Sequence, residues 1–548
     1  MELAPIGASQ IRSAINKRIR PMPDQQKKYI LAIDLGTSGP KVAIVSTQWE
    51  VLASDFEPTD LDLFGNGAAE QDPEQWWDAI IAASKRLIAL DLVPKNNIIA
   101  ISCTAQWSGT VAVDQAGNHL AKAIIWMDSR GFTSIKKVTK GPVKIEGYAI
   151  NKLIKWIRLT GGAPGHSGKD SIAHILYMKD EMPELYSKAH MFLEPKDYIN
   201  MRLTGKFVST QDTMTLHWVT DNRDINNIKY HKGLLKLSQL DPEKLPPIIK
   251  TTDIIGPIKK DIALKLGLNE NVKVVGGTPD VQSAAIGSGA IRDFEANLCI
   301  GTSSFLTCHV PFKKTDLFHN MASLPSGIPG KYFIANEQET SGVCLDFLKD
   351  NLFFYKDELD TNPEDKDVFE LFSKIAESSP PGSGKLIFTP WLYGERTPVD
   401  DHTIRGGFYN LSLQTTRADM IRAVYEGVAF NSKWLLKYVE KFAGKKFESI
   451  NLIGGGGKSS LWCQILADVL NRQINQVNEP RHANARGAAA LAIVAMGYAT
   501  FEDLADKIII DKEYIPNPDN REIYDKMFEE YLNIYKNNHK MYSRLNKK

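Results

Sequence analysis

The sequence predicts an α/β protein built from two domains of similar plan, with a nucleotide cleft between them. The first indication is a glycine-rich turn, residues 34–39, directly after the apolar run 29–33. The second is a similar turn, 301–303, directly after the apolar run 298–300. In both, a strand enters a tight turn with hydroxyl side chains, where consecutive backbone N–H groups can point at one anion. Because each turn opens one half of the chain, we expect the two halves to grip one nucleotide.

The first half begins with strand signals. Residues 29–34 and 41–45 predict a β-hairpin, and 49–54 adds a third strand. Pro73, followed by an acid, is typical of the start of a helix that continues with helical periodicity over 76–88. The remaining expected elements are strands 98–103 and 111–114, an extended stretch 122–128, helices 143–159 and 171–179, strand 272–275 and a small-residue helix 282–289.

The second half repeats this plan. Strand 296–300, the second turn and a return strand 305–309 predict another hairpin. The stretch 361–367 is polar and reads as an exposed linker. The later expected elements are strand 386–388, an amphipathic helix 416–438, strand 450–453, helix 461–471, a buried helix within 487–499 and a terminal helix 520–542. We therefore predict domains at 29–290 and 291–540, preceded by an extension over 1–28.

Composition narrows the function. The 548 residues carry a net charge of +1, so charge gives no reason to expect nucleic acid or a membrane surface as partner. No apolar run reaches the roughly 18 residues that cross a bilayer. The five cysteines are scattered, which favours free thiols in a cytoplasmic protein over a zinc or disulfide framework. The basic first 28 residues are consistent with an amphipathic helix or a disordered arm, with a targeting peptide as the alternative.

An ordered set of short motifs carries a resemblance. The motifs are Asp34–Ser38, Glu70–Pro73 with Trp76 and Trp77, Trp126-x-Asp128-x-Arg130, Pro195–Tyr198, Gly276–Asp280, Gly301–Ser303, Glu426–Phe430, Gly454–Gly457 and Gly487–Ala489. With these motifs the chain resembles the FGGY carbohydrate kinases over about residues 29–535. It is most similar to their xylulose kinase branch, with glycerol and gluconate kinases as alternatives. The resemblance implies two ribonuclease H-like domains of the actin-like ATPase fold, with ATP and Mg²⁺ as cofactors.

The first turn supplies candidate phosphate and metal ligands. Asp34 is expected to hold Mg²⁺ through water, because Mg²⁺ keeps much of its hydration shell. Gly36, Thr37 and Ser38 are expected to cradle phosphate oxygens. Lys41 is expected to neutralise phosphate charge, with a solvated strand residue as the alternative. Pro40 departs from the small polar residue usual in the family and removes one N–H donor.

Two glycine segments of the second half complete the predicted nucleotide site. Gly301, Thr302 and Ser303 are expected to close over the γ-phosphate. The glycine run that follows strand 450–453 is not a P-loop, because that motif requires glycine where Leu452 stands. The resemblance implies instead that the run passes close to adenosine, and a structural strand–helix junction is the alternative. Its candidate ligand residues are Gly454, Gly455, Gly456 and Lys458.

Asp280 is the candidate general base. It follows a glycine turn and precedes a small-residue helix, so we expect its carboxylate to point into the cleft. A carboxylate beside the acceptor hydroxyl can take its proton as the oxygen attacks phosphorus. The resemblance also implies the catalytic aspartate at this position. A helix-capping role is the alternative, because aspartate is a favoured N-cap residue.

The sugar pocket departs most from the family. The resemblance places Gln106, Trp107 and Ser108 where xylulose kinases carry Gln-Met-His, so a histidine is lost. Val281 stands where asparagine or glutamine is usual. Trp107 is expected either to stack on the sugar or to fill core space. Trp126 and Asp128 are further candidates for the pocket border, and an internal ion pair from Asp128 to Arg130 is the alternative.

Together these features predict an ATP-dependent kinase that phosphorylates a hydroxyl of a small ketose or polyol, most readily a ketopentose such as xylulose. Ribulose, gluconate and glycerol remain alternative acceptors. Two other classes are a chaperone-like or filament-forming ATPase of the same fold and a non-catalytic sugar sensor. We expect a cytoplasmic enzyme with a small-molecule sugar as partner, and a homodimer is one option for its assembly.

Overall fold

The computed structural model describes residues 27–353 and 367–547, so the expectations for residues 1–26 and 361–366 lie outside it. The first half of the chain builds a six-stranded sheet. In sheet order its strands are β16 (Ile254–Pro257), β17 (Lys273–Pro279), β6 (Ile98–Ala105), β1 (Tyr29–Gly36), β2 (Gly39–Ser46) and β3 (Val51–Phe56).

The second half builds an eight-stranded sheet. In sheet order its strands are β20 (Thr315–Asp316), β21 (Met321–Pro325), β22 (Tyr332–Gln338), β19 (Ser304–Val310), β18 (Ala296–Ile300), β25 (Ser449–Ile453), β26 (Gln473–Val477) and β27 (Ile510–Tyr514). Both sheets share one plan: β1–β2–β3 and β18–β19–β22 are antiparallel, while β6 runs parallel to β1 and β25 parallel to β18. The predicted pair of ribonuclease H-like domains is therefore confirmed.

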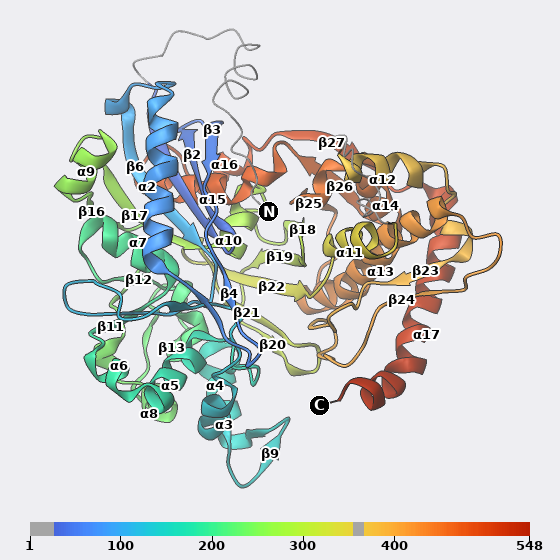
Figure 1. The fold of residues 1–548 in the computed structure, drawn as a ribbon, viewed down its shortest axis with the longest axis horizontal. Coiled ribbons are helices and arrows are strands. Elements are labelled where there is room, and N and C mark those ends of the chain that lie inside the picture. Colours follow the sequence, from blue (N-terminus) through green and yellow to red (C-terminus); the bar gives the residue numbers. More distant parts are fainter. Residues whose placement is uncertain (1–26, 354–366, 548) are drawn as a thin grey trace, which may run out of the picture.

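The first sheet is buried on both faces. Alternate residues of a strand point to opposite sides, so Leu31 and Ile33 share a core with α2 (Pro73–Ala89). Ile30 and Ala32 pack instead with α15 (Ala483–Ala495). This double burial explains why the β1 sequence is continuously apolar. Figure 1 shows the orange α15 beside the blue strands, although it comes from the other end of the chain.

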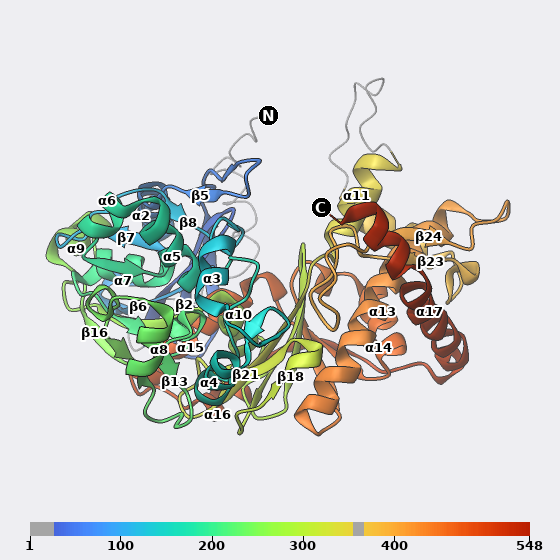
Figure 2. The ribbon, with the colours of Figure 1, turned by 90° about the horizontal axis from the view of Figure 1, so that it is seen from below.

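The second sheet packs against long helices. Leu298 and Ile300 of β18 share a core with α13 (Arg417–Ala443), α14 (Ser460–Leu470) and α17 (Arg521–Asn546). A capping box between Thr416 and Asp419 starts α13, and Gly444 in a left-handed conformation ends it. Figure 2 shows these helices on one side of the molecule and the first-domain helices on the other, with β18 and β21 between them. The predicted long and terminal helices are confirmed.

One predicted helix is wrong in its first part. Residues 143–149 do not begin a helix; β9 (Lys144–Ile145) and β10 (Tyr148–Ala149) form a small hairpin instead. Glu146 and Gly147 both have positive φ, which is the geometry of a two-residue hairpin turn. The helix itself, α4, covers Ile150–Thr160. The local turn chemistry therefore overrides the helical periodicity of the flanking residues.

Between the β7 (Val111–Val113) and β16 segments, helices form a separate core beside the first sheet.

The remaining helices of both domains are α3 (Phe132–Thr139), α5 (Ser171–Glu181), α6 (Pro183–Lys188), α7 (Pro195–Thr204), α8 (Lys232–Ser238), α9 (Lys260–Leu266), α10 (Asp280–Gly287), α11 (Val343–Asn351), α12 (Val368–Glu377) and α16 (Phe501–Ala505). None of the helices in the described part of the chain is long and apolar enough to cross a membrane.

Candidate functional site

The first two residues of the predicted turn 34–39 belong to β1, so in the structure the first turn is residues 36–39 and joins β1 to β2. Asp34 lies two residues before it, is buried, and accepts a hydrogen bond from Asn484 Nδ2 at 3.2 Å. Burial raises the pKa of the Asp34 carboxyl, while Lys41, its cross-strand partner, lowers it. Pro40 pairs with Leu35 inside the β-ladder, so its missing N–H lies outside the tip of the turn. Asn484 belongs to α15, and no motif in the sequence marked it.

Thr37 at the tip of the first turn is held from several directions. Trp126 Nε1 donates to Thr37 Oγ1 at 3.0 Å, and this hydroxyl donates to Gln106 Oε1 at 3.2 Å. Gln71 donates to the Thr37 carbonyl oxygen at 2.8 Å and accepts from Gln106 Nε2 at 2.8 Å. Trp126 and Gln106, predicted to border the sugar, therefore also fix the shape of the first turn. Ser38 is exposed beside them.

The second turn, residues 301–303, joins β18 to β19. The backbone oxygens of Gly301 and Thr302 accept from the N–H groups of residues 342 and 341 at 2.8 and 2.9 Å. The Ser303 hydroxyl donates to Glu337 Oε1 at 3.4 Å, while the Thr302 side chain is exposed. The turn is therefore anchored through its carbonyl oxygens, and Glu337 of β22 lies beside it.

The glycine run after β25 lies against the second turn. A Cβ on Gly454, which has a φ of +86°, would stand 2.4 Å from the Ile300 carbonyl oxygen, so only glycine fits there. Gly456 is packed against the Ile300 side chain. Gly455 differs, because its φ is −62° and nothing lies within 4 Å of a Cβ built on it. Neither backbone conformation nor packing explains glycine at position 455.

Two other turn glycines, Gly36 and Gly301, also have open space where a side chain would lie. A Cβ on Gly36 would meet only the Gly39 carbonyl oxygen at 3.7 Å, and one on Gly301 only the Ser303 oxygen at 3.6 Å. Both distances are ordinary van der Waals contacts, and neither glycine has a left-handed φ. Absent side chains at these positions leave the backbone open to a ligand. These three glycines therefore form a candidate ligand-facing surface on both domains.

Basic groups gather near the same surface. Lys41 Nζ donates to the Arg481 carbonyl oxygen at 3.1 Å, which links β2 to the loop before α15. Partial desolvation and then the Arg481 guanidinium lower the pKa of Lys458, which lies at the end of the glycine run. Arg481 therefore interacts with both lysines, through its backbone with Lys41 and through its charge with Lys458, although the sequence predicted the two lysines separately from the two halves of the chain. Clustered cations of this kind attract phosphate groups.

Asp280 is a partly buried carboxylate on which two other carboxylates act. Asp280 is the first residue of α10, and its Oδ1 accepts from the Val281 N–H at 2.8 Å. Burial and the negative charges of Asp34 and Glu337 raise the pKa of Asp280 to about 7, against backbone hydrogen bonds from Val281 and Trp107. The N-cap position belongs to Pro279, so Asp280 does not cap the helix. Asp34 precedes the first turn, and Glu337 accepts from Ser303 of the second, so the charges that act on Asp280 come from both domains.

The predicted sugar-side residues have defined partners. Trp107 Nε1 donates to the Thr213 carbonyl oxygen at 3.3 Å, and Ser108 Oγ donates to the Lys169 carbonyl oxygen at 2.6 Å. Asp128 is buried, pairs with Arg130 at 2.6 Å and accepts from the Ala69 N–H at 3.0 Å. Its oxygens are thus engaged inside the first domain, as in the internal ion-pair alternative.

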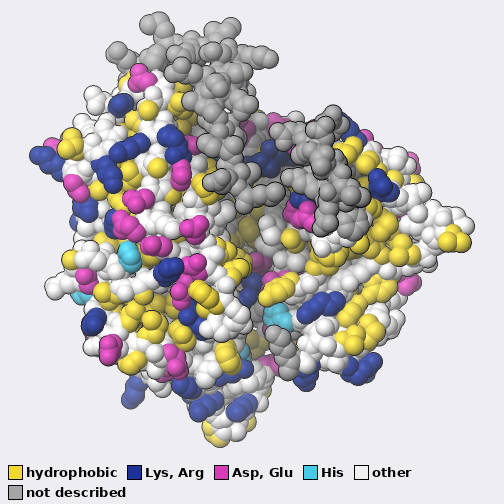
Figure 3. Space-filling view, viewed as in Figure 1, with side chains coloured by type: hydrophobic (Ala, Val, Ile, Leu, Met, Phe, Trp, Pro, Cys, Tyr) yellow, Lys and Arg dark blue, Asp and Glu magenta, His cyan; other side chains and the backbone are white. Residues whose placement is uncertain are grey.

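The sequence did not indicate Arg396, a charged residue that lies beside Glu337 in the second domain. Arg396, in the loop after β23 (Ile387–Thr389), pairs through Nη1 with Glu337 at 2.5 Å and through Nε with Glu339. Glu395 lies beneath and accepts from the backbone N–H groups of residues 396 and 339. The available signal was the charged pair Glu395-Arg396 in the loop that follows buried strand β23. In Figure 3 a hollow separates the two domains near the middle of the face shown.

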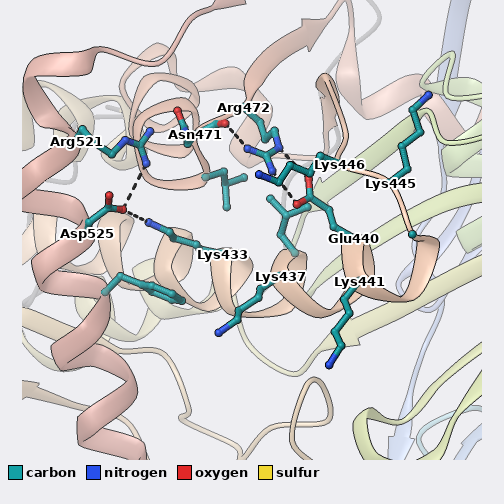
Figure 4. Close-up of a pocket in the computed structure, with 14 residues that line it drawn as sticks. Lys433, Lys437, Glu440, Lys441, Lys445, Lys446, Asn471, Arg472, Arg521 and Asp525 are labelled. Atoms are coloured by element: carbon teal, nitrogen blue, oxygen red, sulfur yellow. Dashed lines mark hydrogen bonds and ion pairs between the residues drawn. The ribbon is translucent and has the colours of Figure 1, made fainter.

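A cavity of about 640 Å³ lies elsewhere, on the outside of the second domain between α13, α17 and the turn after α14 (Figure 4). Its lining is rich in lysine and arginine. The two acids there are already paired, Glu440 with Arg472 and Asp525 with Lys433, each at 2.7 Å. The surplus lysines stand near the carboxyl end of α13, where the helix dipole favours cations. None of the predicted site residues lines this cavity.

Comparison with known proteins decides the family. The model of the FGGY carbohydrate kinase N-terminal domain matches residues 29–287, and that of the C-terminal domain matches residues 296–496. The chain belongs to the FGGY family of carbohydrate kinases. The kinase is 30% identical to a xylulose kinase of Staphylococcus epidermidis, over 93% of this chain and 97% of that protein.

Solved structures agree. A ligand-bound xylulose kinase from Lactobacillus acidophilus matches with a TM-score of 0.82 and 27% identity, covering 94% of this kinase and all of that chain. A gluconate kinase from the same organism matches with a TM-score of 0.82 and 27% identity, covering 95% and 100%. The predicted family, two-domain fold and sugar kinase class are confirmed.

Proposed function

We propose that this kinase transfers the γ-phosphate of ATP to a hydroxyl of a small ketose, with a ketopentose such as xylulose as acceptor. The position of Asp280 carries the proposal. Burial, together with the charges of Asp34 of the first domain and Glu337 of the second, raises the pKa of its carboxyl to about 7. Such a group can accept the proton of an acceptor hydroxyl while remaining largely ionised above pH 7.

The nucleotide is assigned to the surface that contains the open glycines. Gly36 and Gly301 expose turn backbone from the two domains, and Gly455 offers a bare backbone that nothing in the described protein covers. Phosphate charge would be met by Lys41 and by Lys458. We assign the phosphates to the two turns and the adenosine to the glycine run at 454–456. Phosphoryl transfer depends chiefly on positioning, and this arrangement would hold the transferred phosphate between the two domains.

Asp34 fits a magnesium site. Its carboxylate is buried beside Asn484 and, within the described residues, forms no ion pair that would compensate that burial. A hard cation with an oxygen-rich, largely aqueous shell needs few protein carboxylates. When bound, Mg²⁺ supplies charge neutralisation at the transferred phosphate. Asp34 would orient its hydration shell, and Asn484 would hold the carboxylate in place.

We assign the acceptor pocket to the side of Asp280 on which the backbone of Trp107 lies. The relatives named xylulose kinase support a ketopentose, and the similarity to a gluconate kinase supports gluconate as the alternative acceptor. Ser108 and Val281 depart from the residues usual in xylulose kinases, so the hydrogen-bond partners of the sugar differ here.

We place the domain boundary between residues 290 and 291, with the extension at 1–28. The two family models support this division, since one ends at 287 and the other begins at 296. Five free cysteines, four of them buried, support a cytoplasmic enzyme. A homodimer remains our candidate for its assembly.

An acceptor panel tests the function. The purified kinase with ATP and Mg²⁺ is offered xylulose, ribulose, gluconate and glycerol, and both ADP release and the phosphorylated product are measured. We expect a phosphosugar, with a ketopentose giving the highest kcat/KM. ADP release without any phosphorylated acceptor would reject the proposal, and ATP-dependent polymers in sedimentation would favour a non-sugar ATPase of the same fold.

A further inference from the structure

Charged residues of both domains form a set that we call the polar wall: Lys169, Glu337, Glu339 and Arg396. Glu337 and Glu339 lie at the end of β22, and both pair with Arg396. Lys169 comes from the first domain, directly before α5, and interacts electrostatically with all three. Residues more than 160 positions apart in the chain therefore form one polar wall. The side chains of Glu337 and Arg396 are about a quarter to a third exposed, so this wall is accessible to a small ligand.

Lys169 is held by a fixed segment rather than by a loose surface loop. Its carbonyl oxygen accepts from the Ser108 hydroxyl at 2.6 Å. A Cβ on Gly168, which has a φ of +79°, would stand 2.2 Å from the backbone nitrogen of Phe132, so the segment passes tightly against α3. On the other side, Asp170 accepts from the Trp218 indole at 2.7 Å. The backbone of Lys169 is therefore clamped on both sides.

The ammonium group of Lys169 lacks a close partner in residues 27–353 and 367–547, since neither a hydrogen bond nor an ion pair reaches it. The residue is only partly exposed, and burial together with Arg396 lowers the pKa of its ammonium. Arg396 Nη2 is likewise buried without a hydrogen-bond acceptor among the described residues. Unsatisfied buried donors are costly and rare in folded proteins. Arg396 Nη2 is such a buried donor, whereas the Lys169 ammonium still reaches solvent and is a second available donor. Together they favour a ligand with acceptor oxygens.

Glu337 relates this wall to the reacting end of the cleft. Glu337 accepts from the Ser303 hydroxyl of the second turn at 3.4 Å, and its charge adds to the burial that raises the pKa of Asp280. Burial raises the pKa of Glu337 itself, and the Arg396 and Lys169 charges act against this rise. Glu337 therefore neighbours both groups. A molecule with one hydroxyl at Asp280 would turn its remaining oxygens toward Lys169.

The charge balance decides which oxygens suit this wall. Lys169 and Arg396 are offset by Glu337 and Glu339, and Asp34 and Asp280 add negative charge nearby. Counted as formal charges, these four acids outnumber the two cations, which disfavours a carboxylate ligand here. Uncharged carbonyl or hydroxyl oxygens avoid repulsion from the acids and still satisfy the free donors.

We propose that Lys169 is a specificity-determining residue, which donates hydrogen bonds to carbonyl or hydroxyl oxygens of a neutral ketose and disfavours aldonates. The assignment rests on the proposed sugar kinase function. Ser108 is too short to replace the histidine of the resembled kinases directly, and its hydroxyl instead fixes the backbone of Lys169. Ser108 thus acts as a positioning residue for the group that contacts the sugar.

Steady-state kinetics of Lys169→Met test the proposal. Loss of a hydrogen bond from a charged donor predicts a rise in KM for the ketose of about 10- to 100-fold. KM for ATP should change much less, because Lys169 is not one of the residues assigned to the phosphates or the adenosine. Lys169→Arg should recover part of the affinity. The matched control is Lys155→Met in α4, another partly buried lysine, whose Nζ donates to the Gly233 carbonyl oxygen away from the cleft.

The outcomes separate this inference from the proposed function. If the wild-type kinase phosphorylates a ketose but folded Lys169→Met keeps its KM, Lys169 does not contact the sugar. A wild-type preference for gluconate over every ketose overturns the neutral-acceptor assignment. Failure of the wild-type protein to phosphorylate any sugar rejects the proposed function itself.

Differential labelling of the wild-type kinase avoids dependence on variant folding. Lysines are acylated with and without saturating xylulose, and the extent of modification at Lys169 is measured by peptide mass spectrometry. We expect xylulose to protect Lys169 and to leave Lys155 unchanged. Equal modification of Lys169 with and without the ketose contradicts the contact.

Discussion

The carboxylate of Asp34, near the end of β1, adds to the burial that raises the pKa of Asp280, at the start of α10. The two residues are 246 positions apart and belong to different elements of the first domain. Glu337 of the second domain acts on Asp280 in the same direction. The proposed base is therefore tuned by charges from both sides of the cleft, so its protonation reports how the two domains are arranged.

Replacing the proposed base tests its role. We expect Asp280→Asn to lower kcat by about 10²- to 10⁴-fold, the usual contribution of a positioned general base. Binding of Mg²⁺-ATP, measured by calorimetry, should persist because Asp280 does not hold the nucleotide. Thermal stability should not fall, since the substitution removes a carboxylate in an unfavourable environment. Unchanged turnover would show that another group accepts the proton.

The protonation of Asp280 predicts a pH dependence. A base must be ionised to act, so activity should rise as pH increases through about 7. In the ligand-free kinase, carbon NMR of the labelled carboxyl should give a value near 7 for Asp280. Asp34→Asn removes one repelling charge and should move that value down. An Asp280 value near that of a free aspartate in the wild type would contradict the arrangement of carboxylates.

Gly455 tests the nucleotide surface. Its helical φ and empty surroundings predict that Gly455→Val changes thermal stability little, because surface substitutions cost within about 0.5 kcal/mol. The added side chain should nevertheless raise KM for ATP. Gly65→Val is the matched control, since that glycine also has nothing within 4 Å and no left-handed φ. Equal KM values for ATP in both variants would remove the glycine run from the nucleotide site.

Trp126 separates a positioning role from a sugar contact. Trp126→Phe removes the indole donor to Thr37 Oγ1, a hydrogen bond of about 1 kcal/mol. We expect KM for ATP to rise about fivefold, since the first turn loses one of its supports. KM for the ketose should change less. A larger effect on the ketose than on ATP would assign Trp126 to the sugar pocket.

Local patterns predicted the two hairpins with their turns and the helices α2, α13, α14 and α17. Alternation of side chains, capping residues and turn glycines all act over a few neighbouring positions, and a sequence displays such constraints directly. The motifs around Asp34, Asp280 and Gly301 were recognisable for the same reason. The hairpin at Glu146 and Gly147 was missed because a two-residue turn interrupts an otherwise helical pattern.

The partners of these residues came only from the packed structure. Asn484 reaches Asp34 across 450 positions because α15 lies against the first sheet, although along the chain it stands between β26 and β27 of the second. Arg396 and Glu337 pair, and their charges act on Lys169, only because the helical segment of the first domain and a loop of the second are packed near each other. Short-range periodicity carries no information about such distant contacts, which depend on how buried faces stack. The turns and the candidate base can therefore be read along the chain, whereas the groups that tune and surround them are set by domain packing.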